Sequence, residues 1–345
     1  MDKRFTSIEV LKGVGIIYLI GLHEWVWFFL DLSTHQLSYE QMQGVFPLFG
    51  YFGLHVLGFE VPLLAGITYY LALRRKKTSF VVVLKRSLIL IGLGYIVNFM
   101  CWGASGVSAW DVLHFIGLSM IISYPCLRLF PRGINLLFPV LIGTIALFYS
   151  SKFPLSSFSG SYIYEFMIGS KAGEHFWPFC PWYFVFSTGF VVGHALEINK
   201  ARYFKSLLIL GIIFVVSSFW AKAFLPAVTM ELWGVPMFKP SPFYVLGIVG
   251  TSILIILGLE FLFRSKPGVR LMVEKSFVVL MGRAILWIYL LNTIVGYHLT
   301  FGILKKYNPD FNQAIWAYLS VVMTTLLAGY IIAFAINQKR TVDYV

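Results

Sequence analysis

The chain has 345 residues, of which 59% are apolar and only 12% are charged, and its mean hydropathy is +0.80. Soluble domains are about 45–50% apolar and about 25% charged, so this composition places most of the chain in a lipid bilayer. It excludes a soluble enzyme, a disordered tail and a disulfide scaffold. The net charge of +12 is typical of basic loops on one side of a membrane and does not require nucleic-acid binding.

Ten apolar runs are each close to the length of about 20 residues that a membrane-spanning helix needs. In chain order they cover residues 8–30, 45–73, 80–101, 112–130, 134–150, 177–196, 203–225, 243–263, 277–299 and 314–336. Lys3 and Arg4 precede the first run, but no small-residue cleavage site follows it, so we expect it to be retained as a helix. The sequence predicts an all-α, polytopic membrane protein with one transmembrane domain over residues 1–345.

The basic residues are distributed unevenly between the two sides of this ten-span arrangement. Twenty-one of the 27 Lys and Arg residues fall on the side that holds both termini, and six fall on the other side. Because cytoplasmic loops carry the excess of Lys and Arg, both termini are predicted to be cytoplasmic. We expect the plasma membrane as the location.

Lys12 and His23 are ionisable residues within the first apolar run, where such groups are costly unless they face a partner or a cavity. They are eleven residues apart, which places both on one face of a helix at about 100° per residue. Two interpretations stay open. The residues form one functional polar stripe, or Lys12 reaches the lipid headgroups and His23 bonds to a neighbouring helix.

Asp111 and His114 lie three residues apart at the start of the fourth run, and so on one face of a helix. A carboxylate that accepts a proton from one imidazole nitrogen leaves the other nitrogen as a base or donor. The alternative is an ordinary helix start, with Asp111 in the first turn.

His55 and Glu60 are five residues apart, so they do not lie on one face of a helix and would contact different partners. No third ligand stands at helical spacing from the Asp111–His114 pair or from the His23–Glu24 pair, so no metal site is predicted.

Basic residues also cluster near the predicted inner ends of the second and third runs. They either hold a polyanionic cofactor or only set the topology. The cluster consists of Arg74, Arg75, Lys76, Lys77, Lys85 and Arg86.

Five segments of the chain carry a resemblance to a known family. In chain order they are SIEVLKGVGIIYLIGLHEW, LHVLGFEVPLLAGITYYLALRRK, WDVLHFIGLSMI, FWPFCPWYFVFSTGFVVG and LMGRAILWIYLLN. They resemble, in the right order, the transmembrane acyltransferases that include heparan-alpha-glucosaminide N-acetyltransferase, the YeiB-like bacterial proteins and the acyltransferase-3 family.

The resemblance has matches and departures. In the first segment His23 keeps the His of the family pattern, whereas Glu9 and Lys12 replace its Asp and Arg. In the second segment His55 and Gly66 match. In the last segment Asn292 stands where the family often has a His.

The resemblance implies transfer of an acyl group, often acetyl, from cytosolic acyl-CoA to an amine or hydroxyl of a sugar or another acceptor at the outer face. On this interpretation His23 is the first candidate for the general base, and His35, shortly after the first span, is the second. Asp111 and His114 would position the acceptor, and His55 matches a family His. Lys12 and Arg283 would join Arg74, Arg75, Lys85 and Arg86 in holding the CoA ester from the inside.

The expected partners are the lipid bilayer, acyl-CoA and a saccharide or another small acceptor, with no nucleic acid and with a homodimer as an open alternative. Two rival functions remain. A proton-coupled transporter or flippase also needs a polar pathway through the bilayer. A binding protein without catalysis is the other rival, because Glu9, Lys12 and Asn292 depart from the family pattern.

Overall fold

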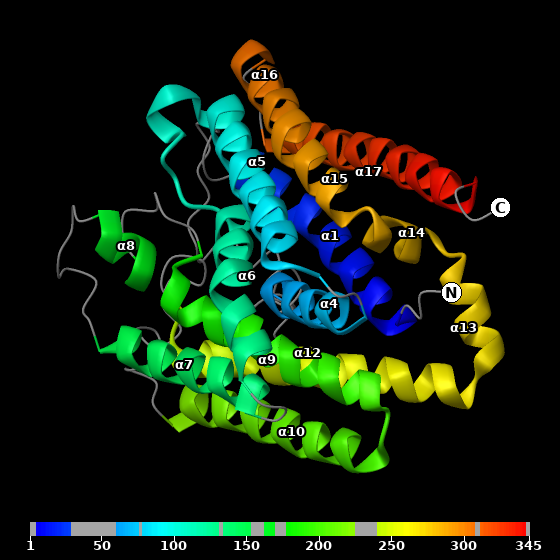
Figure 1. Ribbon diagram of the computed structural model, residues 1–345. Helices are drawn as coiled ribbons and strands as arrows, with labels where there is room; N and C mark the ends of the chain where they lie inside the picture. The colour runs from blue at the N-terminus through cyan, green and yellow to red at the C-terminus, as the bar shows by residue number, and fades with distance from the viewer. Residues whose placement is uncertain are drawn as a thin grey trace. The chain divides into compact units, whose positions relative to one another are not determined.

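Long α-helices account for nearly all of the described chain in the computed structural model (Figure 1). The structure describes residues 5–28, 60–75, 78–130, 134–152, 162–169, 177–224, 240–307 and 311–342. The chain divides into two compact units. Unit 1 consists of Met1–Gly58 and Gly258–Val345, and unit 2 consists of Phe59–Leu257.

Within these described ranges, nine helices are long and apolar enough to cross a membrane. Their spans are Thr6–Trp25, Phe80–Gly106, Val112–Leu129, Ile134–Ser151, Phe179–Ile198, Ala201–Ala221, Pro242–Ser265, Ile285–Tyr307 and Asn312–Gln338. The prediction of an all-α polytopic membrane protein is therefore confirmed. The predicted span over residues 45–73 lies partly outside the described residues, and its described part is the 15-residue helix α4 (Val61–Arg75).

One predicted span begins later than expected. The run from Phe277 was expected to be continuous, but the helix is interrupted after Arg283, where Ala284 has φ −110° and ψ 15°. A short helix, α14 (Phe277–Arg283), therefore precedes the span, which starts at Ile285. Hydropathy averaged over the length of a span does not register this break, because apolar residues lie on both sides of it.

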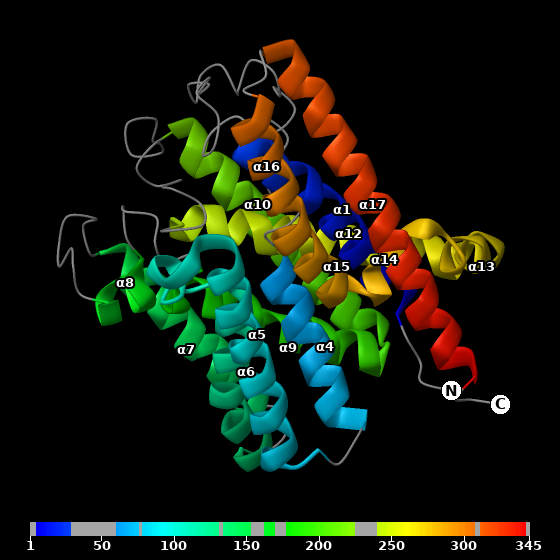
Figure 2. The same ribbon diagram turned by 90° about the horizontal axis from the view of Figure 1, so that it is seen from above.

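Unit 1 joins the first helix of the chain to the last ones. Its helices are α1 (Thr6–Val26), α13 (Pro267–Glu274), α14, α15 (Ile285–Leu291), the π-helical turn η3 (Asn292–Gly296), α16 (Tyr297–Tyr307) and α17 (Phe311–Val342). The end of α12 (Pro242–Ser265) also belongs to this unit. Figure 2 shows α17 running beside α1 and α14, so elements from the two ends of the chain form one bundle.

Two glycines bring α1 and α14 into close contact. A Cβ atom on Gly13 would overlap the carbonyl oxygen of Val278, and one on Gly282 would overlap the carbonyl oxygen of Glu9. Only glycine allows the two backbones to approach this closely, as is common between helices in membranes. The contact holds the first half of α1 in place.

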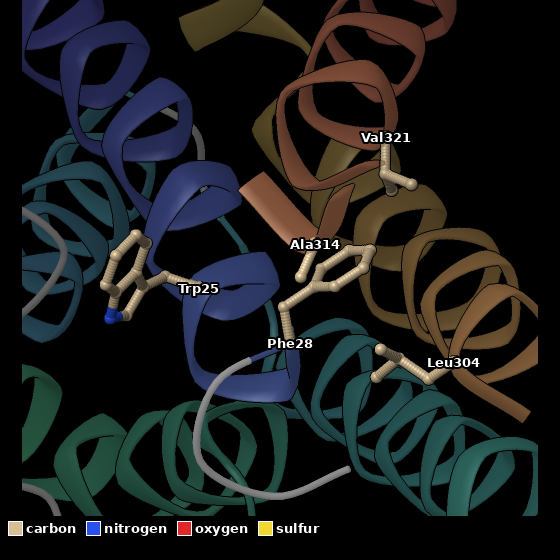
Figure 3. Close-up of a cluster of buried hydrophobic side chains, with 5 residues drawn as sticks. All are labelled: Trp25, Phe28, Leu304, Ala314 and Val321. Atoms are coloured by element: carbon tan, nitrogen blue, oxygen red, sulfur yellow. The ribbon is translucent and has the colours of Figure 1, made fainter. Parts of the chain in front are cut away.

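Apolar packing holds the other end of α1. Trp25 and Phe28 belong to a buried cluster with Leu304 of α16 and with Ala314 and Val321 of α17 (Figure 3). The Tyr318 hydroxyl adds a hydrogen bond to the carbonyl oxygen of Gly21 at 3.3 Å. The residues of α1 between these two contacts are therefore held against the last helices of the chain.

Hydrogen bonds to carboxylates tie the start of α1 to its neighbours. The Thr6 hydroxyl donates a hydrogen bond to Oε1 of Glu274 on α13 at 2.7 Å, and the Ser7 hydroxyl donates one to Oε1 of Glu260 on α12 at 2.5 Å. Arg270 donates to the same Glu274 carboxylate at 2.8 Å. The hydrogen bond from Thr6 and the bond and charge of Arg270 lower the pKa of Glu274 below its ordinary value of 4.5.

We expect Glu274→Gln to lower the thermal stability of the purified protein at pH 7 by at most about 1 kcal/mol, because partly exposed ion pairs are screened by water. A carboxyl group with a lowered folded-state pKa stabilises the fold fully above its unfolded pKa and loses that effect as the pH falls. The melting-temperature difference from wild type should therefore shrink as the pH is lowered from 7 through 4. A constant difference across this range would contradict the assignment.

Unit 2 is arranged around one buried helix, α9 (Phe179–Ile198). The other helices are α4, α5 (Phe80–Gly106), α6 (Val112–Leu129), α7 (Ile134–Ser151), α8 (Tyr162–Ile168), α10 (Ala201–Phe224) and the part of α12 up to Leu257. The helices α4, α6, α7, α8 and α10 contact α9, whereas α5 packs on α6. Large aromatic side chains of α9 fill the centre, among them the fully buried Trp182, Tyr183 and Phe186.

The contact between α4 and α9 depends on glycine. A Cβ atom on Gly66 would collide with the carbonyl oxygen of Phe186, and one on Gly189 would collide with that of Leu63. We therefore expect Gly66→Ala to destabilise the protein by about 1–3 kcal/mol, the usual cost of overpacking a core. Gly92→Ala is the matched control, because a Cβ there meets nothing within 4 Å. Equal melting temperatures for the two variants would contradict the packing.

Candidate functional site

A hydrogen-bond network in unit 1 joins α1 to the π-helical turn and to α16. Nδ1 of His23 lies 3.0 Å from Oδ1 of Asn292. Nδ2 of Asn292 donates to Oε1 of Glu24 at 3.0 Å, and the Thr300 hydroxyl donates to Oε2 of Glu24 at 2.6 Å. The network thus connects two adjacent residues of α1 with two residues much further along the chain, through hydrogen bonds between partners 268 to 276 positions apart.

These contacts determine the tautomer of His23. A carboxylate only accepts hydrogen bonds, so the amide NH₂ of Asn292 faces Glu24 and its carbonyl oxygen faces His23. That oxygen accepts a hydrogen bond from Nδ1–H of His23, so in the neutral ring Nε2 carries the free lone pair. Nε2 of His23 has no hydrogen-bond partner among the described residues. His23 is therefore oriented to accept a proton at Nε2.

The π-helical turn brings Asn292 and Thr300 to the same side of their helix. Eight residues of regular α-helix turn through about 800°, which would leave the two side chains about 80° apart. The π-turn accommodates one extra residue, so the same eight residues turn through about 700°, within about 20° of two full turns. Gly296 completes the fit, because a Cβ atom there would overlap Oε1 of Glu24.

The surroundings of the network differ from one end to the other. Glu24 and Asn292 are completely buried, whereas His23 is only partly buried. The imidazole lies against two aromatic rings, with centroid distances of 5.3 Å to Trp27 and 6.3 Å to Tyr289. The network therefore has a buried carboxylate at one end and a more accessible imidazole at the other, as a proton-accepting base requires.

Asp111 and His114 lie in unit 2, and their contact differs from the functional interpretation of the sequence. Asp111 is the N-cap residue of α6, and its backbone N–H donates to Nδ1 of His114 at 3.1 Å. The two residues form a capping box, which satisfies N–H groups at the helix start. The predicted carboxylate–imidazole contact is therefore not the contact observed, and the alternative of a helix start describes it better.

The capping contact leaves His114 as a hydrogen-bond donor. Because Nδ1 accepts from the backbone, the proton of the neutral ring lies on Nε2, which has no partner among the described residues. The ring is completely buried against Gly94, Tyr95 and Trp110. Nε2 of His114 therefore carries a proton and can donate a hydrogen bond, whereas Nε2 of His23 carries a lone pair and can accept one.

The predicted CoA-binding cations are divided between the two units. In unit 1, Nζ of Lys12 lies 3.5 Å from Oε1 of Glu9, and Arg283 is the last residue of α14. The others are in unit 2, where Arg74 lies 3.6 Å from Glu197 and where Arg75, Lys85 and Arg86 are exposed. Lys12 and His23 both lie on α1, but their contacts are with different partners.

Two predicted residues, His35 and His55, lie outside the described residues.

Three members of the observed network had no assigned role in the sequence analysis, namely Glu24, Asn292 and Thr300. A buried carboxylate in an apolar run was a usable signal for Glu24, because it needs partners. The sequence contains no comparable signal for Thr300, since threonines are common in membrane helices.

These features define a polytopic α-helical membrane protein in which hydrogen bonds join a partly buried histidine, through Asn292, to a buried carboxylate. The sequence model for the catalytic domain of heparan-alpha-glucosaminide N-acetyltransferase matches residues 4–219, which is more than half of the chain. The chain therefore belongs to this family of membrane acetyltransferases, as the resemblance predicted. No curated protein matches the chain. The matched part includes His23 and Glu24, whereas Asn292 and Thr300 lie beyond it.

Proposed function

We propose that the protein transfers an acyl group, in the first instance acetyl, from cytosolic acyl-CoA to an amine or hydroxyl at the outer face of the membrane. The family description favours the amine of a glucosaminide as the acceptor. The observation that carries the proposal is the contact of His23 with Asn292 and, through it, with Glu24. It leaves a lone pair on a partly buried imidazole, which is what activation of an acceptor requires.

In the proposed reaction, the neutral acceptor nitrogen or oxygen attacks the thioester carbonyl carbon. The new C–N or C–O bond forms as Nε2 of His23 takes the proton from the attacking atom. The C–S bond then breaks, and the CoA thiolate receives that proton from Nε2, which regenerates the neutral ring. Asn292 accepts the hydrogen bond from Nδ1 throughout, and the Glu24 carboxylate stabilises the positive charge of the transient imidazolium.

The remaining predicted residues have supporting roles in this proposal. Lys12, Arg283, Arg74, Arg75, Lys85 and Arg86 would bind the phosphates of the CoA ester. Asp111 would hold His114 in the tautomer that presents Nε2–H, and that group would donate a hydrogen bond to an oxygen of the acceptor. His35 and His55 stay second choices for the base.

The direction of transfer depends on orientation, which we propose from the distribution of Lys and Arg, with both termini in the cytoplasm of the plasma membrane. A membrane-impermeant thiol reagent applied to intact cells should label Ser156→Cys and not Thr78→Cys. Labelling of Thr78→Cys alone would invert the proposed topology.

The donor is tested by the thermal stability of the detergent-purified protein in the presence of CoA, acetyl-CoA and longer acyl-CoA esters. A ligand at 100 times its Kd stabilises the folded state by about 2.7 kcal/mol. Because CoA carries several negative charges, we expect the stabilisation to weaken as salt is added. No stabilisation by any CoA ester would contradict the donor assignment.

Turnover distinguishes the proposed enzyme from its rivals. Incubation with acetyl-CoA and glucosamine should release free CoA thiol together with N-acetylated sugar in equal amounts. A transporter or a binding protein without catalysis would release neither product, even if it binds the acceptor.

A further inference from the structure

The short helix α13 is the one helix in the described part of unit 1 that has no fully buried residue. It follows the span that ends at Ser265 and precedes the span that begins at Ile285, so it lies at one face of the membrane. With eight residues it is about 12 Å long, too short to cross a bilayer. Figure 2 shows it beside α14 at the edge of the unit.

The rotation of α13 is determined by Glu274, which accepts hydrogen bonds from Thr6 of α1 and from Arg270. A residue two positions away on a helix points about 200° from Glu274, so Met272 points away from α1. Met272 is 71% exposed on that side. Leu271 is 62% exposed and points about 100° around the helix from Met272, so the exposed surface of α13 carries two large apolar side chains.

Basic residues flank this apolar surface. The segment from Arg264 to Lys275 contains four basic residues and one acidic residue. Arg264 pairs with Glu260, and Arg270 pairs with Glu274. Lys266 and Lys275, which cap the two ends of α13, are exposed and have no ion-pair partner among the described residues. The exposed apolar surface of α13 thus has a lysine without an ion-pair partner among the described residues at each end of the helix.

We propose that α13 is an interfacial anchor that binds anionic lipid. Met272 and Leu271 insert at the boundary between headgroups and acyl chains, and Lys266 and Lys275 bind lipid phosphates. An amphipathic helix with a basic edge binds a membrane surface in this way, and its position between two spans places it at that surface. The proposal does not depend on the acyl-transfer activity, because none of these residues belongs to the His23 network.

The experiment uses the full-length protein with Met272→Cys, labelled with an environment-sensitive fluorophore and reconstituted in lipid nanodiscs. Cys101, Cys126 and Cys180 are buried, and wild-type protein measures their background labelling. The nanodiscs contain either phosphatidylcholine alone or phosphatidylcholine with about one third phosphatidylglycerol, and spin-labelled lipids serve as quenchers. We expect blue-shifted emission, and at least about twofold stronger quenching by a shallow spin label than by one at the bilayer centre.

Charge reversal tests the lipid phosphates. Lys266→Glu with Lys275→Glu should abolish the additional blue shift that phosphatidylglycerol produces at the Met272 label. Lys305→Glu with Lys306→Glu makes the same charge change at the end of α16 and should leave that shift intact. Quenching by aqueous iodide but not by spin-labelled lipid would overturn the proposal, and so would emission indifferent to phosphatidylglycerol. Self-quenching that requires two copies per disc would also overturn it, by showing that a second copy covers the helix.

Discussion

Replacing His23 by Gln should reduce acyl transfer by about 10² to 10⁴, the usual contribution of a general base, while the CoA ester still binds. Gln keeps much of the size of the side chain and a group that donates toward Asn292, but it has no basic nitrogen in the place of Nε2. The measurement compares the rate of CoA release at saturating acetyl-CoA with stabilisation of the same preparation by the ester.

His298→Gln is the matched control for this variant. His298 lies on α16 in the same unit, but its side chain is exposed and takes no part in the network. We expect its activity to equal that of wild type. Loss of both folding and donor binding in His23→Gln would make His23 a structural residue. Full activity would contradict the assignment of the base and transfer that role to His35, His55 or His114.

Asn292→Leu should lower kcat by about tenfold to hundredfold, with little change in the KM for acetyl-CoA. The substitution keeps the approximate volume but removes both the acceptor for Nδ1 of His23 and the donor to Glu24. Removal of the hydrogen-bond partner that orients a metal-ligating His typically costs about this much activity, and we expect a similar loss for a His that acts as a base. Asn292 is therefore expected to act as a positioning residue, through His23.

A double-mutant cycle separates this role from a general loss of stability. If Asn292 acts only by orienting His23, the double variant His23→Gln with Asn292→Leu should be no less active than His23→Gln alone. Thermal unfolding of all three variants provides the structural readout. Multiplicative losses of activity would contradict the coupling and would make Asn292 independent of the proton transfer.

The fold class could be predicted because span length and hydropathy are local properties of the sequence. Nine of the ten predicted runs correspond to spans in the described residues, most with ends within a few residues. The break after Arg283 was not predicted, because apolar residues lie on both sides of it. The π-turn was also unpredictable, because a single additional residue in an apolar helix does not change its composition.

The candidate site was only partly predictable. His23 could be singled out because an imidazole in an apolar run is costly and because it matches a family position. Its partners were out of reach, since a single sequence indicates which face of a helix is polar but not which helix lies opposite. Asp111 and His114 show the converse case. Their three-residue spacing does place them in contact, but this spacing suits a capping box as well as a carboxylate–imidazole pair. Only the atomic positions distinguish these two arrangements.

The separation of the network's two halves along the chain has a consequence for biogenesis. Glu24 is hydrogen-bonded to Asn292 and Thr300, which lie 268 and 276 positions later in the chain. These partners are therefore synthesised only after most of the protein has been made. Until α16 is inserted, the nascent first helix carries, near one end of its span, a carboxylate that lacks these partners and is costly to hold in the bilayer. Insertion of the last helices is therefore the step that relieves this cost, and a ribosome stalled before Asn292 would leave α1 poorly held in the membrane.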